Sequence, residues 1–117
     1  MNQDIKERSF EFAVRIVKLC RETEVSSSVN RILLNQLIRS STSIGANIEE
    51  ANGSKSKADF VAKMYIACKE ALETNYWLRL LNATEVIKHR CLESLLDESN
   101  QIVAILTAIV KKAKINK

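Results

Sequence analysis

The segment from Ser40 to Leu81 constrains the fold of this chain more than any other part of the sequence. It reads SSTSIGANIEEANGSKSKADFVAKMYIACKEALETNYWLRLL, with very small residues first, then a polar break, then a long heptad pattern. Small residues let two helices approach closely, and a heptad pattern gives a helix one continuous apolar seam. The segment therefore predicts two long helices that pack against each other.

The whole chain is short of the residues that make turns. Its 117 residues contain no proline and only 2 glycines, Gly45 and Gly53. Folds rich in strands need many turns, and turns draw on glycine and proline. Because a chain of this length holds one core, the sequence predicts a single all-α domain over residues 1–117.

Apolar periodicity divides the chain into four amphipathic helices, expected at about residues 5–23, 28–51, 56–82 and 87–114. Asp4 is the expected N-cap of the first helix, and Ser56 with Asp59 resembles a capping box before the third. Gly53 is a natural residue to follow the end of the second helix. Short connections between long helices imply antiparallel neighbours, which predicts an up-down-up-down four-helix bundle.

Each helix has an expected core face. On the first, two neighbouring stripes are Phe12, Ile16 and Leu19, and Phe10, Ala13, Val17 and Cys20. The second carries Ile32, Leu33, Leu37, Ile38, Ser41, Ile44 and Ile48. The seam of the fourth is Leu92, Leu95, Ser99, Ile102, Leu106, Ile109 and Ala113. Such stripes predict burial against the neighbouring helices.

The third helix carries more apolar surface than one bundle needs. Its seam repeats at alternating spacings of four and three residues, over Phe60, Met64, Ala67, Ala71, Thr74, Leu78 and Leu81. Further round the helix lie Val61, Tyr65, Cys68, Leu72, Ile66, Trp77 and Leu80. So wide an apolar arc predicts packing inside the bundle and also against another subunit, hence a homo-oligomer.

The net charge of +4 is located at the C-terminal end of the chain. Residues 111–117 read KKAKINK and contain four lysines and no acid. Removing those four from the 18 basic residues leaves 14, which balances the 14 acidic residues over residues 1–110. This tail is either a solvated helix end that interacts favourably with the helix dipole, or a contact with a polyanion.

The cysteines and the N-terminus indicate the cellular compartment. Cys20, Cys68 and Cys91 are widely spaced among apolar residues, and none belongs to a C-x-x-C pair. Reduced core cysteines fit better than a zinc site or a disulfide framework. The N-terminus is too charged for a signal peptide, and no apolar run approaches the ~18 residues of a membrane span. We therefore expect a cytoplasmic protein with no membrane contact.

Three phrases, in this order, resemble a known bacterial family. They are SFEFAVRIVKLC at 9–20, QLIRSSTSIGANIEEANG at 36–53 and SKADFVAKMYIACKEALETNYWLRLL at 56–81. The pattern resembles the "four helix bundle protein" family, also known as the 23S rRNA intervening-sequence protein family. The resemblance implies a left-handed four-helix bundle that assembles as a homopentamer, with an unassigned biochemical role. A similar bundle, the accessory protein of diversity-generating retroelements, is a basic pentamer that binds nucleic acid; the neutral body of this chain differs from it.

Two groups of lysines are candidate contacts with RNA or DNA. The turn at residues 53–57 precedes a helix N-terminus, where free N–H groups and the helix dipole favour anions. It lacks the strand and the spacing of a Walker motif, and turn chemistry alone also explains its composition. Repetition around a ring would multiply weak contacts. The candidate residues are Lys55, Lys57, Lys111, Lys112 and Lys114.

Polar residues on the second helix match a polar set on the third. The two sets are Gln36, Arg39, Ser43, Asn47 and Glu50, and Glu70, Glu73 and Thr74. Our interpretation is a structural network that fixes helix register, because polar groups inside a bundle must satisfy one another. The alternative is catalytic. Glu49, Glu50, Glu70 and Glu73 resemble the E-E-x-x-E…E-x-x-D arrangement with which all-helical nucleotide pyrophosphohydrolases hold Mg²⁺. Gly53 and Glu73 depart from that pattern.

The remaining chemistry-bearing residues have structural interpretations. His89 is the only histidine, which excludes paired Glu-x-x-His di-iron motifs and disfavours Ser-His or Cys-His chemistry; we expect it to be solvated. Tyr76 and Trp77 are either packed in a core or interface, or platforms for base stacking.

The sequence as a whole predicts a non-enzymatic oligomeric assembly or adaptor protein, with no cofactor and no small-molecule substrate. RNA or DNA binding is the first activity to test. A protein-interaction scaffold is the alternative, followed by the Mg²⁺-dependent nucleotide pyrophosphohydrolase.

Overall fold

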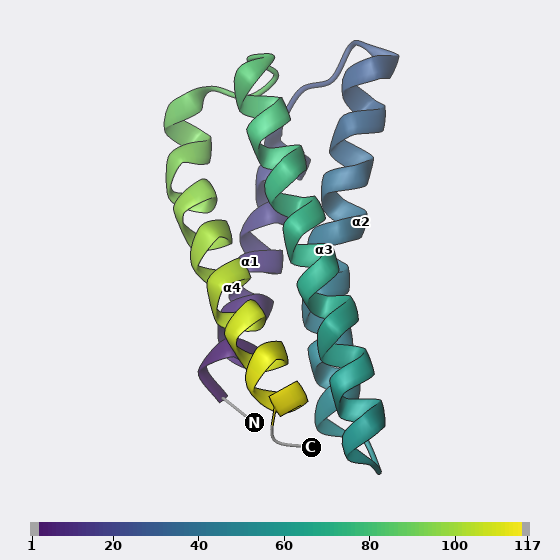
Figure 1. Ribbon diagram of the computed structural model, residues 1–117. Coiled ribbons are helices and arrows are strands. Elements are labelled where there is room, and N and C mark those ends of the chain that lie inside the picture. Colours follow the sequence, from purple (N-terminus) through teal and green to yellow (C-terminus); the bar gives the residue numbers. More distant parts are fainter. Residues whose placement is uncertain (1–2, 116–117) are drawn as a thin grey trace.

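The computed structural model describes the backbone of residues 3–115 and the side chains of residues 5–114, and this part of the chain is all-α (Figure 1). Its four helices are α1 (Gln3–Glu22), α2 (Ser28–Asn52), α3 (Lys57–Ala83) and α4 (His89–Ile115). The observed limits lie within two residues of the expected ones. Asp4 lies inside α1 and not before it, and its side chain is outside the described ones.

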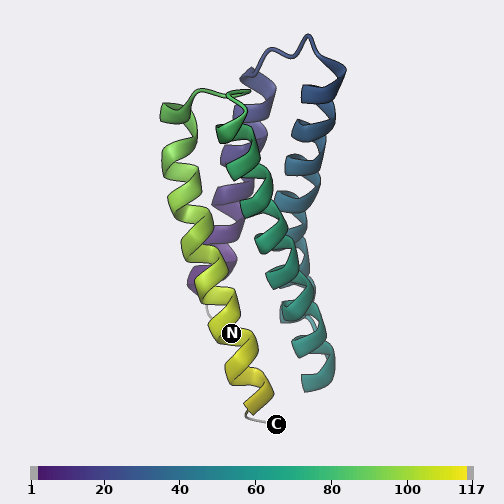
Figure 2. The same cartoon turned by 45° about the horizontal axis from the view of Figure 1, so that its top comes forward.

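Each helix runs antiparallel to the next, in the expected up-down-up-down order (Figures 1 and 2). The helices pack in the order α1, α2, α3, α4, with α2 against α3 the most extensive contact and α1 against α4 the smallest. The result is an elongated bundle of 48 × 21 × 20 Å. One end of this bundle holds the starts of α1 and α3 and the ends of α2 and α4.

Serine side chains begin α2 and α3. Ser27 Oγ accepts a hydrogen bond from the Asn30 N–H at 3.4 Å, and Ser56 Oγ accepts one from the Asp59 N–H at 3.1 Å. Each bond satisfies one of the N–H groups that a helix N-terminus leaves without a partner. The expected N-cap of α3 is therefore correct.

The C-terminal ends of α2 and α3 differ from expectation, because positive φ occurs at the end of α3 and not at the glycine that ends α2. Gly53 ends α2 with a φ of −91°, so this turn does not use the conformational freedom of glycine. Positive φ occurs instead at Glu85, at 58°. There the N–H groups of Glu85 and Val86 donate to the carbonyls of Asn82 and Leu81, at 3.2 Å each. This pair of bonds is a Schellman motif, in which glycine is the usual residue at the position of Glu85.

The predicted seams form most of the core. On α3 all seam residues are buried except Phe60, which is half-buried. The small residues Ala67 and Ala71 lie on that face, opposite the helix that carries buried Ser40 and Ser41. Small side chains on both partners explain why α2 and α3 have the most extensive contact.

Some expected core positions are exposed. Ile32 is 60% exposed, and Leu34 is buried in its place. The buried residues of α2 repeat every three or four positions from Leu34 onward, so Ile32 lies about 200° away around the helix. On α1 Phe10 and Val17 face solvent, whereas Ala13 and Cys20 of the same stripe are half-buried, because the core takes the adjacent stripe. No helix in the described part of the chain is both long enough and apolar enough to span a bilayer.

Candidate nucleic-acid interface

The fold brings both predicted lysine groups to the same end of the bundle. Lys55 and Lys57 lie at the turn between α2 and α3, and the tail lysines lie in the last turns of α4. Figure 1 shows that the end of α4 and this turn lie at the same end of the bundle. All five lysines are exposed: Lys55, Lys57, Lys111, Lys112 and Lys114. Because α3 and α4 are antiparallel, the start of one lies at the end of the other.

Two acidic side chains at this end, Glu49 and Glu50, pair with other bases. Glu50 Oε1 accepts a hydrogen bond from Lys63 Nζ at 2.9 Å, and Glu49 Oε2 lies 3.6 Å from Lys6 Nζ. The hydrogen bond to Glu50, together with the charge of that carboxylate, raises the pKa of Lys63. Among the described residues, no carboxylate lies within ion-pair distance of the five candidate lysines. Within the described part of the protomer, none of them therefore has an ion-pair partner, and the nearest acid along the chain is the exposed Asp59 in the first turn of α3.

Tyr65 extends this basic end onto the outer face of α3. Its side chain is 48% exposed, with Lys114 Nζ 5.0 Å and Lys69 Nζ 5.7 Å from the ring centroid. Lys69 reaches the ring because helical side chains lean toward the N-terminus, over the residue four positions earlier. Lys114 reaches it from α4. The sequence analysis grouped Tyr65 with the apolar arc, and nothing local in the sequence indicated its neighbour at residue 114.

Tyr76 and Trp77 have different environments. Trp77 is half-buried against the core and donates its Nε1–H to Glu73 Oε2 at 2.9 Å. Tyr76 is exposed, packs edge-to-face on Trp77 with centroids 5.1 Å apart, and has the Arg79 guanidinium 5.8 Å from its ring centroid. Trp77 therefore has a packing role, whereas about half of the Tyr76 residue is exposed to solvent.

The predicted polar network separates into independent groups. Arg39 donates to Gln36 Oε1 at 3.0 Å and to Glu70 Oε1 at 3.3 Å, and also bonds Glu73. Asn47 bonds only within α2, donating to the carbonyl and the hydroxyl of Ser43 at 2.9 and 3.0 Å.

Thr74 belongs to a separate buried pair: its hydroxyl oxygen lies 2.9 Å from Ser40 Oγ and 2.8 Å from the Glu70 carbonyl oxygen, within hydrogen-bond distance of both. Glu50 pairs with Lys63 as described above. The structure thus joins Gln36, Arg39, Glu70 and Glu73, and leaves Ser43, Asn47, Glu50 and Thr74 outside that cluster. Ser40 and Trp77 complete these groups, although the sequence analysis assigned neither of them to the network.

The Arg39 cluster lies at the surface and not inside the bundle. The Arg39 side chain is 48% exposed, because position 39 lies about 200° around α2 from the buried Leu37. Exposed ion pairs contribute about 0–1 kcal/mol to the free energy of unfolding. The expectation that these groups must satisfy one another in a dry interior is therefore wrong for this cluster.

The four carboxylates of the pyrophosphohydrolase alternative do not gather. Glu49 and Glu50 pair with Lys6 and Lys63, whereas Glu70 and Glu73 pair with Arg39. Within residues 5–114, no group of three or more His, Cys, Asp or Glu side chains is placed to hold a metal ion. The described geometry therefore gives Mg²⁺ no prepared site at these residues.

Comparison with known proteins identifies the relatives of this chain. The sequence profile of the 23S rRNA-intervening sequence protein family matches residues 1–108. The chain belongs to that family. It is also similar to a solved structure, a protein of unknown function from the S23 ribosomal protein family of Bacteroides thetaiotaomicron, with 45% sequence identity and a TM-score of 0.80. That similarity covers 92% of this chain and 98% of the other. No match was found among curated proteins.

Two of the segments that resemble the family, residues 36–53 and 56–81, contribute polar side chains that meet between α2 and α3. Gln36 and Arg39 come from the phrase on α2, and Glu70, Glu73 and Thr74 come from the phrase on α3. Four of these five residues form the Arg39 cluster, and Thr74 forms the buried pair beneath α2. The family pattern thus follows the contact between α2 and α3.

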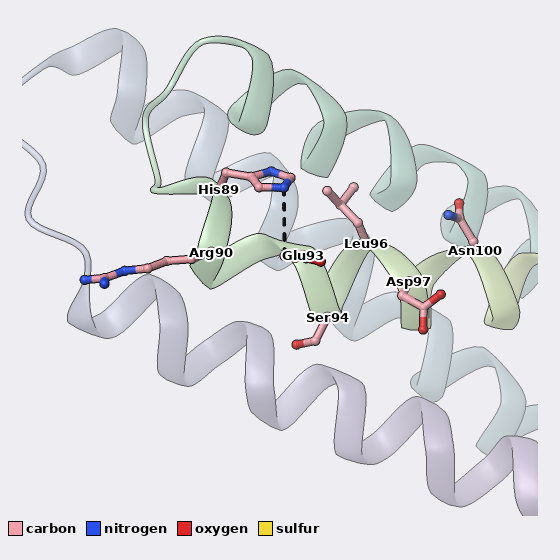
Figure 3. A pocket seen from close by; sticks show the side chains of 7 residues that line it. All are labelled: His89, Arg90, Glu93, Ser94, Leu96, Asp97 and Asn100. Carbon is pink, nitrogen blue, oxygen red and sulfur yellow. Dashed lines mark ion pairs between the residues drawn. The ribbon is translucent and has the colours of Figure 1, made fainter.

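A groove with a volume of about 580 Å³ lies along α4 of this family member (Figure 3). Its lining is His89, Arg90, Glu93, Ser94, Leu96, Asp97 and Asn100. His89 is exposed, as expected, and its Nδ1 lies 2.9 Å from Asn82 Oδ1. Because one helix supplies every residue, the side chains point to different sides, as Figure 3 shows, and do not converge on one ligand.

Exposed apolar residues gather on two different sides of the bundle. The α3 surface, which we define as Leu72 and Tyr76, four residues apart on one side of that helix, is exposed to solvent. The α1–α2 groove, of about 300 Å³, is lined by Lys6, Phe10, Ala13, Thr42, Gly45, Ala46 and Glu49. Phe10 is the large exposed apolar residue of this groove. Exposed apolar surfaces of this kind mark sites of association.

Proposed function

We propose that this family member is a non-enzymatic, ring-forming protein that binds nucleic acid, most readily RNA, through the lysine-rich end of the bundle. The observation that supports this most is the convergence of five exposed lysines from two distant segments, with no carboxylate of the described residues within ion-pair distance of them. Lysine contacts with phosphate release counterions, which drives binding without any sequence preference.

Self-association is supported by the two apolar surfaces. The α3 surface and the α1–α2 groove lie on different helices. The α3 surface of one copy would therefore pack into the α1–α2 groove of the neighbouring copy. Such a head-to-tail contact produces a closed ring when the rotation between copies closes. We propose five copies and a left-handed bundle twist, because the family resemblance implies both.

A ring strengthens weak lysine contacts. In a cyclic assembly every copy points the same way along the ring axis, so all lysine-rich ends lie on one face. A nucleic acid bound to one end is then held close to the next, which increases overall affinity without new contacts. We place this activity in the cytoplasm, where the free cysteines Cys20, Cys68 and Cys91 would stay reduced.

The test is a salt-dependent gel shift with a 30-nucleotide single-stranded RNA. We expect wild-type binding to weaken steeply between 50 and 200 mM salt, by about a factor of 10 or more if several phosphates are contacted. The double variant Lys55→Glu/Lys57→Glu should bind more weakly with a smaller salt slope, because it reverses two charges at the site. Lys88→Glu at the opposite end of the bundle is the matched control and should bind as wild type. Equal binding by the double variant would remove the turn from the interface.

Truncation after Val110 separates the two lysine groups, because it removes the tail and leaves the turn. A scaffold without nucleic-acid function is the alternative that the exposed apolar surfaces also support. Such a scaffold would show no affinity for RNA once the tail is removed, whereas the proposed interface keeps a reduced, salt-sensitive affinity through Lys55 and Lys57.

A further inference from the structure

We infer that Tyr65, with Lys69 and Lys114, forms a site at which one unpaired base of a single-stranded nucleic acid stacks on the tyrosine ring. The two ammonium groups would contact the phosphates on either side of that base. This inference rests on the proposed function and adds a recognition site to it. Lys114 is one of the five candidate lysines, whereas Tyr65 and Lys69 are new.

The geometry of the site is unusual for an exposed tyrosine. Two ammonium groups from different helices lie within 5.7 Å of the centroid of one ring, and nearly half of the tyrosine side chain stays exposed. Among the described residues, neither Lys69 nor Lys114 has a carboxylate at ion-pair distance. Glu73, the acid four residues after Lys69, is occupied by Arg39 and by the Trp77 indole. Both lysines therefore keep an unneutralised charge beside an aromatic surface.

These charges argue against burial of Tyr65 between two subunits. Moving two ammonium groups into a dry interface without anionic partners costs more than the apolar contact of one ring returns. Tyr65 also lies about 10 Å along α3 from Leu72, at the rise of 1.5 Å per residue in a helix. The outer side of α3 thus divides into an apolar part, which includes Leu72, and a basic part at Tyr65 that favours contact with an anion.

A base can displace an ammonium group from the ring. An exposed cation–π contact is weaker than the stacking of a nucleobase on an aromatic side chain. The displaced ammonium group loses little, because the phosphate beside the stacked base offers it a stronger electrostatic partner. Bases in a duplex are already stacked and paired, so the site selects single strands over duplexes.

The experiment compares variants of Tyr65 in the full chain, with fluorescence anisotropy of a labelled 20-nucleotide oligouridine and of a 20-base-pair RNA duplex. Tyr65→Leu should weaken oligouridine binding by roughly 5- to 150-fold, the range found when a stacking aromatic is removed. Tyr65→Phe keeps the ring and should bind within about twofold of wild type. Duplex binding should change little in either variant.

Lysine variants test the phosphate contacts. Lys69→Gln and Lys114→Gln should each reduce the salt slope for the single strand by about 0.7, the value for one lost phosphate contact. Lys88→Gln, an exposed lysine at the opposite end of the bundle, should leave the slope unchanged. Sedimentation of every variant in the same buffer shows whether assembly has changed.

The outcomes separate this inference from the proposed function. If wild type binds neither RNA, the proposed function and this site both fail. If wild type binds but Tyr65→Leu binds equally well, the lysine-rich end stands and the stacking site is wrong. If Tyr65→Leu loses binding only because the oligomer dissociates, Tyr65 belongs to the subunit contact and the inference is overturned.

Discussion

Glu85 occupies a backbone position that suits glycine or asparagine better, since its φ is 58° at the Schellman end of α3. The left-handed conformation costs an ordinary residue about 1 kcal/mol, and asparagine tolerates it more easily. Glu85→Asn should therefore raise the free energy of unfolding in urea by about 0.5 kcal/mol. Glu85→Gln removes the same charge but keeps the strained conformation, so it should be neutral. Equal stabilisation by both variants would assign the effect to charge.

The three cysteines should differ in reactivity. Burial raises the pKa of Cys20 from 9.0 to about 11, Cys68 is buried, and Cys91 is exposed. Because the thiolate is the reactive form and Cys91 is exposed, iodoacetamide at pH 8 should modify Cys91 first. Mass spectrometry of the peptides measures the labelling of each cysteine. Labelling of Cys20 should rise roughly tenfold per pH unit up to its raised pKa, as its thiolate fraction rises. Equal rates in the folded protein at pH 8 would contradict this, and equal rates in denaturant are the control.

At the scale of helices, the contact between α2 and α3 depends on a buried hydroxyl pair. Thr74 and Ser40 are both fully buried and their hydroxyls are hydrogen-bonded at 2.9 Å. Thr74→Val keeps the shape but leaves the Ser40 hydroxyl without this partner, so it should lower the free energy of unfolding by about 1–3 kcal/mol. The same change at exposed Thr42 is the control and should cost much less.

A double-mutant cycle completes this test. Thr74→Val combined with Ser40→Ala should cost less than the sum of the single changes, since the double variant leaves neither hydroxyl unsatisfied. Strict additivity in urea unfolding would show that the two side chains do not depend on each other.

At the scale of the whole molecule, assembly and nucleic-acid binding should fall together. Leu72→Gln introduces no charge but places a polar group on the α3 surface, so sedimentation at micromolar concentration should show smaller species. RNA affinity should then fall by about 10-fold or more through lost avidity. Ile32→Gln changes an exposed apolar residue outside both apolar surfaces and should alter neither property. A stable wild-type protomer at that concentration would contradict self-association itself.

Much of the fold followed from periodicity. The seam from Met64 to Leu81 is buried as predicted, because alternating spacings of four and three residues keep one face of a helix toward its neighbours. Ile32 was placed wrongly, because two apolar stripes on one helix look alike until the buried one is known. The polar network was predicted as one unit, yet only its Arg39 part forms across α2 and α3, since exposure differs among residues that share a spacing.

The sequence by itself determined the four helices, the Ser56 N-cap of α3 and the buried seam of α3, because each depends on residues within a few positions of one another. Only the tertiary structure decided which distant residues meet. Lys55 and Lys57 share an end of the bundle with the tail lysines, and Lys114 reaches Tyr65, because turns of a few residues fold α2, α3 and α4 back on one another in one register. That register follows from the packing of whole helices, which no local pattern records.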